Sequence, residues 1–172
     1  MDVPIIETER LRLRGWRRED FDPFAALRGS AEDQAYTGGA VPRQQAWTEF
    51  CAKAGEWTVQ GLGVFIVAER ETDRAVGYAG LWFPPYIEEP ELCWSLFPGN
   101  TGKGYATEAA LAARDWAYEA LGLGPLMSFV HPDNLASRAV AERLGAVAEG
   151  WGELKGEPRL IYRHSGPEKV AG

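Results

Sequence analysis

The chain is poor in the residues that bind metals or form disulfide bridges. Its 172 residues include two cysteines, Cys51 and Cys93, two histidines and two methionines. The sequence has no CxxC pair and no histidine cluster, so it predicts no zinc site, and we expect no metal. Two cysteines without a disulfide framework are typical of a reducing compartment, and we expect a cytoplasmic protein.

Long apolar runs and excess positive charge are also absent. No stretch approaches the roughly 18 uncharged apolar residues that a membrane-spanning helix needs. The first residues are acidic and carry no apolar run, so we do not expect a secretory signal. Eighteen Lys plus Arg against 25 Asp plus Glu leave a formal charge of −7. This charge repels phosphate backbones, so we expect neither nucleic acid nor a membrane as a partner.

The remaining composition is that of an ordinary folded domain. Apolar residues make up 45% and charged residues 25%, with 20 glycines and 11 prolines. A chain of this length buries roughly 70% of its unfolded surface without a covalent staple. We therefore expect a single domain over residues 1–172, with a frayed tail from about residue 165.

Hydrophobic periodicity predicts a mixed order of strands and helices. In residues 10–16 leucines alternate with arginines, as in a half-buried strand, and the spacing of Trp47, Phe50, Cys51 and Ala54 predicts a helix from Arg43 to about Trp57. Further strands are expected over 63–70, 75–83, 91–97, 126–130, 147–154 and 159–164, and further helices over 18–28, 105–121 and 134–144. This order favours an α/β chain of the α+β kind, with one mixed sheet and helices on both faces.

The segment from Glu91 to Ala109 combines a strand, a glycine-containing loop and the start of a helix. Such a loop exposes backbone N–H groups at a helix N-terminus, which favours an anionic, phosphorylated ligand. A Walker loop needs Ser or Thr where Gly104 stands, and the dinucleotide motif needs Gly or Ala where Thr107 stands. On spacing alone, the alternative interpretation is that these glycines merely form a tight turn.

Five segments together carry a resemblance to a known family. They are 7–14 (ETERLRLR), 90–94 (PELCW), 101–109 (TGKGYATEA), 134–137 (NLAS) and 141–146 (AERLGA). In this order and spacing they closely resemble the GNAT superfamily of acetyl-CoA-dependent N-acetyltransferases, over roughly residues 5–164. The branch they resemble most is RimJ/RimL, which acetylates ribosomal-protein N-termini and, in many relatives, other amines.

The resemblance implies a GNAT-like fold with a mostly antiparallel central sheet. It also implies direct transfer of an acetyl group from acetyl-CoA to a primary amine of a protein N-terminus or small molecule. The backbone of the loop would hold the coenzyme pyrophosphate, through Thr101, Gly102, Lys103, Gly104, Tyr105, Ala106 and Thr107. The family usually has Gln or Arg where this chain has Thr101, although Gly104 and Ala106 fit the pattern.

Other coenzyme contacts follow from the same resemblance. The strand edge at Leu96 and Phe97 would pair with the pantetheine arm like an added strand, and an amide near Phe97 would donate to the thioester oxygen. Lys103 is expected to add a phosphate contact. Arg143 is a candidate for the adenosine phosphates, with an ordinary solvated helix residue as the alternative.

Asn134 and Ser137 open a predicted helix. From periodicity alone, Asn134 is an N-cap and Ser137 a first-turn residue. The resemblance implies that Asn134 also helps to hold the pantetheine and that the Ser137 hydroxyl lies near the sulfur. A hydroxyl at this position can protonate the departing thiolate, so Ser137 is a candidate catalytic residue.

Glu91 is the candidate general base. A lone carboxylate on a half-buried strand is often a solvated or ion-paired residue. Glu91 shares a strand face with Cys93 and Ser95, near the expected position of the acetyl group, and could accept the amine proton through a water molecule. We interpret Cys93 as structural, because no histidine is nearby in the sequence to activate it.

Two other classes of function stay open on the sequence alone. One is a coenzyme A-binding module without turnover, and the other is an interaction domain in which the glycines are only structural. The acceptor is not encoded in a recognisable motif, although a net charge of −7 favours cationic amines by electrostatic steering. A homodimer is a further expectation, because relatives often pair.

Overall fold

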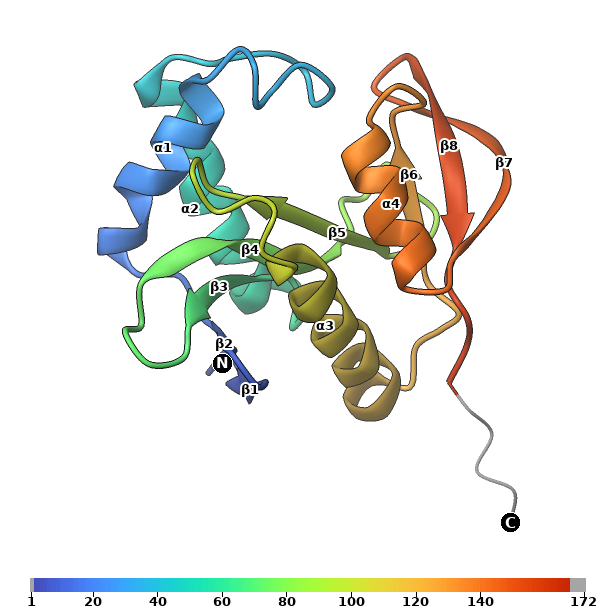
Figure 1. Cartoon of the computed structure of the whole chain (residues 1–172), viewed down its shortest axis with the longest axis horizontal. Helices are drawn as coiled ribbons and strands as arrows, with labels where there is room; N and C mark the ends of the chain where they lie inside the picture. The colour runs from blue at the N-terminus through green and yellow to red at the C-terminus, as the bar shows by residue number, and fades with distance from the viewer. Residues whose placement is uncertain (1, 168–172) are drawn as a thin grey trace.

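The computed structural model describes residues 2–167 (Figure 1). The strands are β1 (Ile6–Glu7), β2 (Leu11–Arg14), β3 (Val64–Glu69), β4 (Ala75–Trp82), β5 (Glu91–Leu96), β6 (Met127–Val130), β7 (Val147–Leu154) and β8 (Glu157–Arg163). The helices are α1 (Phe21–Gly29), α2 (Arg43–Gln60), α3 (Tyr105–Leu121) and α4 (Leu135–Arg143), and a short 3-10 turn over Arg18–Asp20 precedes α1. The tail predicted from residue 165 lies partly outside the described residues.

The eight strands of residues 2–167 form one sheet in the order β1-β2-β3-β4-β5-β6-β8-β7. Every neighbouring pair is antiparallel except β5 and β6, which are parallel. The structure thus confirms a mixed, mostly antiparallel sheet. The two-residue strand β1 was not predicted, because two residues are too few to show a period.

Helices cover both faces of the sheet (Figure 1). The α3 face presents small side chains to the sheet, which allows close approach, and its buried residues are Ala109, Ala110, Ala113, Ala117 and Tyr118. On the other side α1 and α2 pack through an aromatic cluster that includes Phe24 and Phe50. Among residues 2–167, no helix combines the length and the apolar character needed to cross a bilayer.

The buried face of α2 differs from the predicted one. Cys51 is exposed and Trp47 is 38% exposed, whereas Ala46, Phe50 and Trp57 are buried. The apolar residues of this helix fit two adjacent stripes, the predicted one and one through Ala46, Phe50 and Trp57. Burial of the Phe50 and Trp57 rings selects the stripe through Ala46. The helix also runs three residues past Trp57, until Gly61 ends it in a left-handed conformation with φ 73°.

The parallel neighbours β5 and β6 separate after a single paired position, Glu91 with Met127 (Figure 1). On its other side β5 pairs with β4 from Glu91 to Leu96, and the Phe97 amide donates to the Val76 carbonyl oxygen at 2.8 Å. Because N–H groups alternate along a strand, the amides of Trp94 and Leu96 face away from β4. The divergence of β5 from β6 therefore leaves a strand edge open in the middle of the sheet.

Candidate active site

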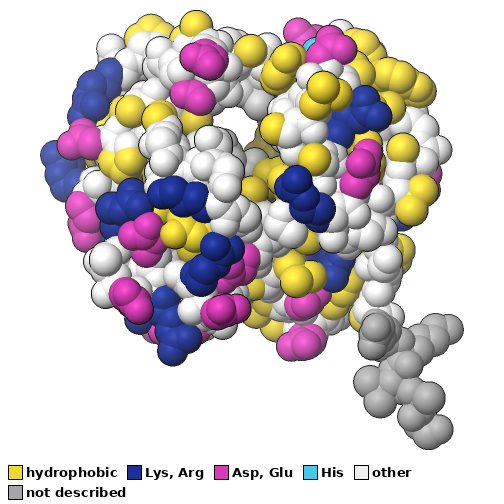
Figure 2. All heavy atoms as spheres, in the orientation of Figure 1, with side chains coloured by type: hydrophobic (Ala, Val, Ile, Leu, Met, Phe, Trp, Pro, Cys, Tyr) yellow, Lys and Arg dark blue, Asp and Glu magenta, His cyan; other side chains and the backbone are white. Residues whose placement is uncertain are grey.

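Two cavities meet at this open strand edge. A groove of about 1100 Å³ lies on the α3 and α4 side, and a pocket of about 340 Å³ lies on the α2 side. Figure 2 shows the molecule hollowed between its two halves in this region. The residues that line both cavities are Thr37, Trp94, Ser95, Asn134 and Ser137. A ligand in the groove and a ligand in the pocket would thus meet beside Ser95 and Ser137.

The groove brings together most of the predicted coenzyme residues. Those that line it are Leu96, Thr101, Gly102, Gly104, Tyr105, Ala106, Thr107, Asn134, Ser137 and Arg143. Two residues predicted to contact the coenzyme, Phe97 and Lys103, do not line the groove. The Phe97 side chain is buried with the α1 and α2 cluster, and Lys103 points its ammonium toward the Tyr105 ring at 5.7 Å.

The loop before α3 is shaped for an anion. Gly102 and Gly104 have φ of 77° and 79°, a left-handed conformation that favours glycine. Gly104 is the N-cap of the 17-residue α3, so the amides that follow it have no partner within the helix. These amides open onto the groove beside Thr101 and Thr107. The arrangement matches a phosphate-binding helix N-terminus.

A brace from the N-terminal segment holds this loop in place. Arg10 Nη1 donates to the Lys103 carbonyl oxygen at 2.8 Å, and its guanidinium pairs with Glu108 at 2.7 Å. Glu108 Oε1 also accepts from the Thr8 hydroxyl at 2.7 Å. The alternation of residues 10–16 predicts Arg10 as an outward residue of the first strand, and its pairing with a residue 98 positions away leaves no periodic signal.

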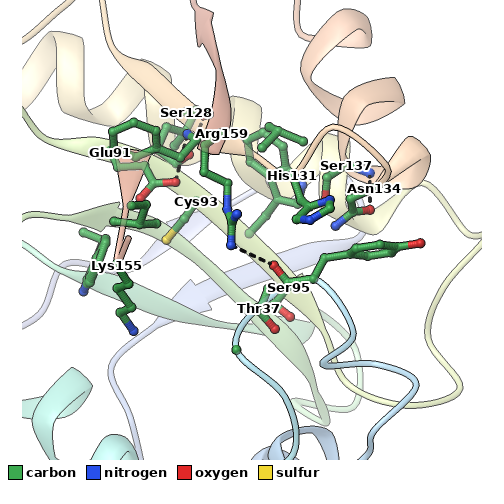
Figure 3. A pocket seen from close by; sticks show the side chains of 18 of the residues that line it. Thr37, Glu91, Cys93, Ser95, Ser128, His131, Asn134, Ser137, Lys155 and Arg159 are labelled. Atoms are coloured by element: carbon green, nitrogen blue, oxygen red, sulfur yellow. Dashed lines mark hydrogen bonds between the residues drawn. The ribbon is translucent and has the colours of Figure 1, made fainter. Parts of the chain in front are cut away.

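Asn134 is the N-cap of α4, as predicted. Its Oδ1 accepts from the backbone amide of Ser137 at 3.1 Å. This bond uses the Ser137 backbone, and Figure 3 shows Ser137 beside Asn134 in the pocket. Ser137 also lines the groove. The cap therefore fixes the place of Ser137 where the groove and the pocket join.

The open edge of β5 presents the backbone amides of Trp94 and Leu96. The Phe97 amide is engaged by Val76, so it is not available to a thioester oxygen. The Leu96 amide, one residue earlier, faces the gap between β5 and β6, and Leu96 lines the groove. The candidate donor near Phe97 is therefore the Leu96 amide.

Glu91 lies at the inner end of the pocket. It is 6% exposed, and its Oε1 accepts from the Phe129 amide at 3.1 Å. Burial raises the pKa of this carboxyl to about 7, while the Phe129 amide and the charges of Lys53 and Arg159 act in the opposite direction. A carboxyl with a pKa near 7 is suited to general base catalysis at neutral pH.

Cys93 and Ser95 follow Glu91 along one face of β5 (Figure 3). Burial and the nearby Glu91 charge raise the pKa of the Cys93 thiol to about 12. A thiol with this pKa is protonated at neutral pH and is a weak nucleophile. This agrees with the interpretation of Cys93 as structural.

Several further walls of the pocket come from residues that the sequence did not single out. Lys53 of α2, Tyr78 of β4 and Arg159 of β8 line it, together with the loop around Thr37. Arg159 Nη2 donates to the Tyr36 carbonyl oxygen at 3.4 Å, and the Tyr36 ring lies 5.0 Å from that of His131. These contacts hold the loop against β6 and β8.

Comparisons with known proteins agree with this geometry. Residues 10–147 match the family described as acetyltransferase (GNAT) domain. The uncharacterized N-acetyltransferase YnaD of Bacillus subtilis is 27% identical over 150 residues, covering 85% of this chain and 84% of that protein. A crystal structure of an acetyltransferase from Agrobacterium tumefaciens is 36% identical, with a TM-score of 0.87 and 96% of each chain covered.

A third comparison concerns the coenzyme. RimL, a ribosomal L7/L12 alpha-N-protein acetyltransferase solved in complex with coenzyme A, has a TM-score of 0.74 and 16% identity, with 92% of this chain and 96% of that chain covered. At this identity the likeness concerns the fold. The family match, the close likeness to the Agrobacterium structure and the two joined cavities lead to one conclusion. The chain belongs to the GNAT acetyltransferase family and is an acetyl-CoA-dependent acetyltransferase.

Proposed function

We propose that the protein acetylates a primary amine by direct attack on acetyl-CoA, as a member of the RimJ/RimL-like branch. The observation that carries this proposal is the junction of the two cavities at Ser95, Asn134 and Ser137. Acetyl-CoA would occupy the groove, with its pyrophosphate on the loop from Thr101 to Thr107. The acceptor amine would enter through the pocket on the opposite side of the sheet.

The residues at the junction suit each step of this reaction. Glu91, directly or through water, takes a proton from the acceptor ammonium, and the free amine attacks the thioester carbonyl. A nitrogen–carbon bond forms, and the developing oxyanion accepts a hydrogen bond from the Leu96 amide. The carbon–sulfur bond then breaks and the Ser137 hydroxyl donates a proton to the thiolate. Ser137 regains a proton from the positively charged nitrogen of the intermediate, which leaves a neutral amide, and Glu91 releases its own proton to solvent.

The acceptor we propose is a protein N-terminus or a small primary amine. The fold shared with RimL supports an N-terminal acceptor, and a ribosomal protein is one such partner. The pocket volume of about 340 Å³ is at the lower end of ligand sites, which favours a single residue or a small molecule at the acetylated end.

The test combines calorimetry with an acceptor panel. We expect acetyl-CoA to bind in an isothermal titration, and free thiol to be released when amines and N-terminal peptides are added. Mass spectrometry would then show one added acetyl group on the acceptor amine. Binding without thiol release over the whole panel would instead identify a coenzyme-binding module without turnover.

A further inference from the structure

The acceptor pocket is lined by more positive than negative side chains, although the whole chain has a net negative charge. Its charged lining residues are Lys53, Lys155 and Arg159 on the positive side, and Glu91 and Glu157 on the negative side. Arg159 pairs with Glu157 at 2.8 Å, so these two charges largely offset each other. The pocket thus keeps two lysines against the single carboxyl of Glu91, in a protein of net charge −7.

Lys53 is the lysine placed to meet a ligand. It follows Ala46 and Phe50 and precedes Trp57 at spacings of 7, 3 and 4 residues, which put it on the buried stripe of α2. Its ammonium lies 5.1 Å from the centre of the Tyr78 ring, on the face of β4 and β5 that also carries Cys93. Lys53 therefore projects from the helix toward the sheet and into the pocket.

The acidic neighbours of Lys53 do not neutralise it through a close ion pair. Glu49 is held by Arg28 at 2.6 Å. Glu56 Oε2 is buried without a hydrogen-bond partner in the described part of the chain, and Glu56 does not line the pocket. Burial lowers the pKa of Lys53, but the neighbouring Tyr78, Cys93, Glu56 and Glu49 outweigh this effect and the net shift is upward, so the ammonium keeps its charge at neutral pH. A charged, half-buried ammonium facing a cavity favours an anionic ligand group.

We propose that the acceptor carries a carboxylate beside its primary amine, and that Lys53 binds this carboxylate. The inference rests on the proposed function, because it assigns the substrate class of the same pocket. The amine would point toward Glu91 and the junction at Ser95, while the carboxylate lies under α2 beside Tyr78. Lys155, an exposed residue of the β7–β8 turn, adds positive charge at the rim.

The same charges disfavour polyamines. A second ammonium on the acceptor would face Lys53 within a pocket where charges are screened less than on the surface. The overall negative charge of the chain acts at long range and favours cationic amines, but the local charges decide which acceptor stays bound. The substrate class expected here is therefore opposite to the one that net charge alone indicates.

The experiment compares acceptors that differ only in the carboxylate. One pair is L-alanine and L-alaninamide, and a second is the amidated dipeptides Asp-Gly and Asn-Gly, with putrescine as a cationic amine. The first pair tests a free amino acid, and the second tests an acidic residue at a peptide N-terminus. We expect kcat/KM to favour the carboxylate member of one pair by roughly 10- to 100-fold, the effect of a hydrogen bond to a charged group.

Variants assign this preference to Lys53. Lys53→Met, which keeps the length of the side chain, should abolish the preference, and Lys53→Arg should keep part of it. Arg18→Met removes the same charge from an exposed surface position outside the pocket and should leave the ratio unchanged. The ratio is measured at a pH well above 7, because loss of Lys53 also raises the pKa of Glu91 and slows both acceptors alike.

The outcomes separate this inference from the proposed function. Equal kcat/KM within both pairs, or a preference for putrescine, would overturn the acidic acceptor while leaving acetyl transfer intact. A preference that survives in Lys53→Met would also overturn it. Absence of thiol release with every amine, despite acetyl-CoA binding, would instead count against the proposed function itself.

Discussion

The Glu91 carboxylate accepts a hydrogen bond from the Phe129 amide across the one point where β5 and β6 pair. This bond holds the carboxyl at the inner end of the pocket, where burial raises its pKa to about 7. If Glu91 is the base, kcat/KM should rise with pH through about 7 and then level off. Glu91→Gln should lower the rate most near neutral pH and recover part of it at alkaline pH, where free amine is available.

The control for this profile is an acceptor amine of low pKa, which needs no base at neutral pH and should be less affected by Glu91→Gln. The measurement is kcat/KM from pH 6 to pH 9 for both proteins. An equal loss at every pH would assign Glu91 to acceptor positioning, and parent-like rates throughout would remove it from the site.

The same substitution should increase stability above neutral pH. The pKa of Glu91 is raised from 4.5 to about 7 in the folded state, so the folded chain holds a proton that the unfolded chain has lost between these values. The free energy of unfolding therefore falls as the pH rises from 4.5 through 7, by an amount on the order of 3 kcal/mol. Glu91→Gln removes this loss.

Denaturant unfolding at pH 5 and pH 8 measures the difference. The two proteins should have similar free energies of unfolding at pH 5, and Glu91→Gln should be the more stable at pH 8. A variant that is less stable at pH 8 would show that the ionised carboxylate is favourable in the fold.

Gly104 should be required for the coenzyme, and Gly99 provides a matched control. Both residues have a left-handed φ, 79° and 80°, so substitution by alanine costs each about 1–2 kcal/mol of stability. A methyl group at Gly104 would lie 3.3 Å from Arg10 Nη2, while one at Gly99 meets nothing within 4 Å. Gly104→Ala should weaken acetyl-CoA binding by about tenfold or more, and Gly99→Ala should not.

Isothermal titration of the two variants gives the comparison. Because backbone strain is the same in both variants, a difference in acetyl-CoA affinity would show that the loop at Gly104, held by Arg10, takes part in binding. Equal acetyl-CoA affinities for Gly104→Ala and Gly99→Ala would show that this loop does not bind the pyrophosphate.

Ser137→Ala tests the proton donor. The cap of α4 uses the Ser137 backbone amide, so the substitution preserves the helix start. We expect turnover to fall by roughly 10²- to 10⁴-fold while acetyl-CoA affinity changes little. Steady-state thiol release and calorimetry measure these two quantities, and near-normal turnover would leave Ser137 as a first-turn residue only.

Cys93 should be dispensable for chemistry. With a pKa of about 12 its thiol is not ionised at pH 8, so Cys93→Ala should keep turnover within a few-fold of the parent. The exposed Cys51 should react first with iodoacetamide, as followed by peptide mass spectrometry. Trapping of an acetyl group on Cys93 would contradict direct attack.

The local parts of the site were predictable from the sequence, and the long-range parts were not. The alternation of Glu91 to Leu96 and the glycines at 102 and 104 placed the strand and the loop correctly, because both depend on near neighbours. The brace between Arg10 and Glu108 joins residues 98 apart, and no local pattern specifies it.

Lys53 shows the same limit in another form. Its place in the pocket depends on which stripe of α2 is buried, and the apolar residues of the helix allow two. The stripe at Trp47, Phe50, Cys51 and Ala54 leaves Lys53 outside, whereas the observed packing of Phe50 and Trp57 turns it inward. The charge of the pocket was therefore not accessible from composition.

Because β5 and β6 separate early, the backbone ladders of the sheet on the two sides of the gap can open separately. Strands β6 to β8 and α4 share a small core around Ala141 and Tyr162, against which Trp94 of β5 packs, and within residues 2–167 one ladder position joins these strands to the rest of the sheet. Each half can thus open for hydrogen exchange without breaking the backbone ladder of the other. A coenzyme seated between β5 and α4 would contact both halves, so its binding would strengthen the coupling that Val140 and Leu144 already provide by packing in the main core.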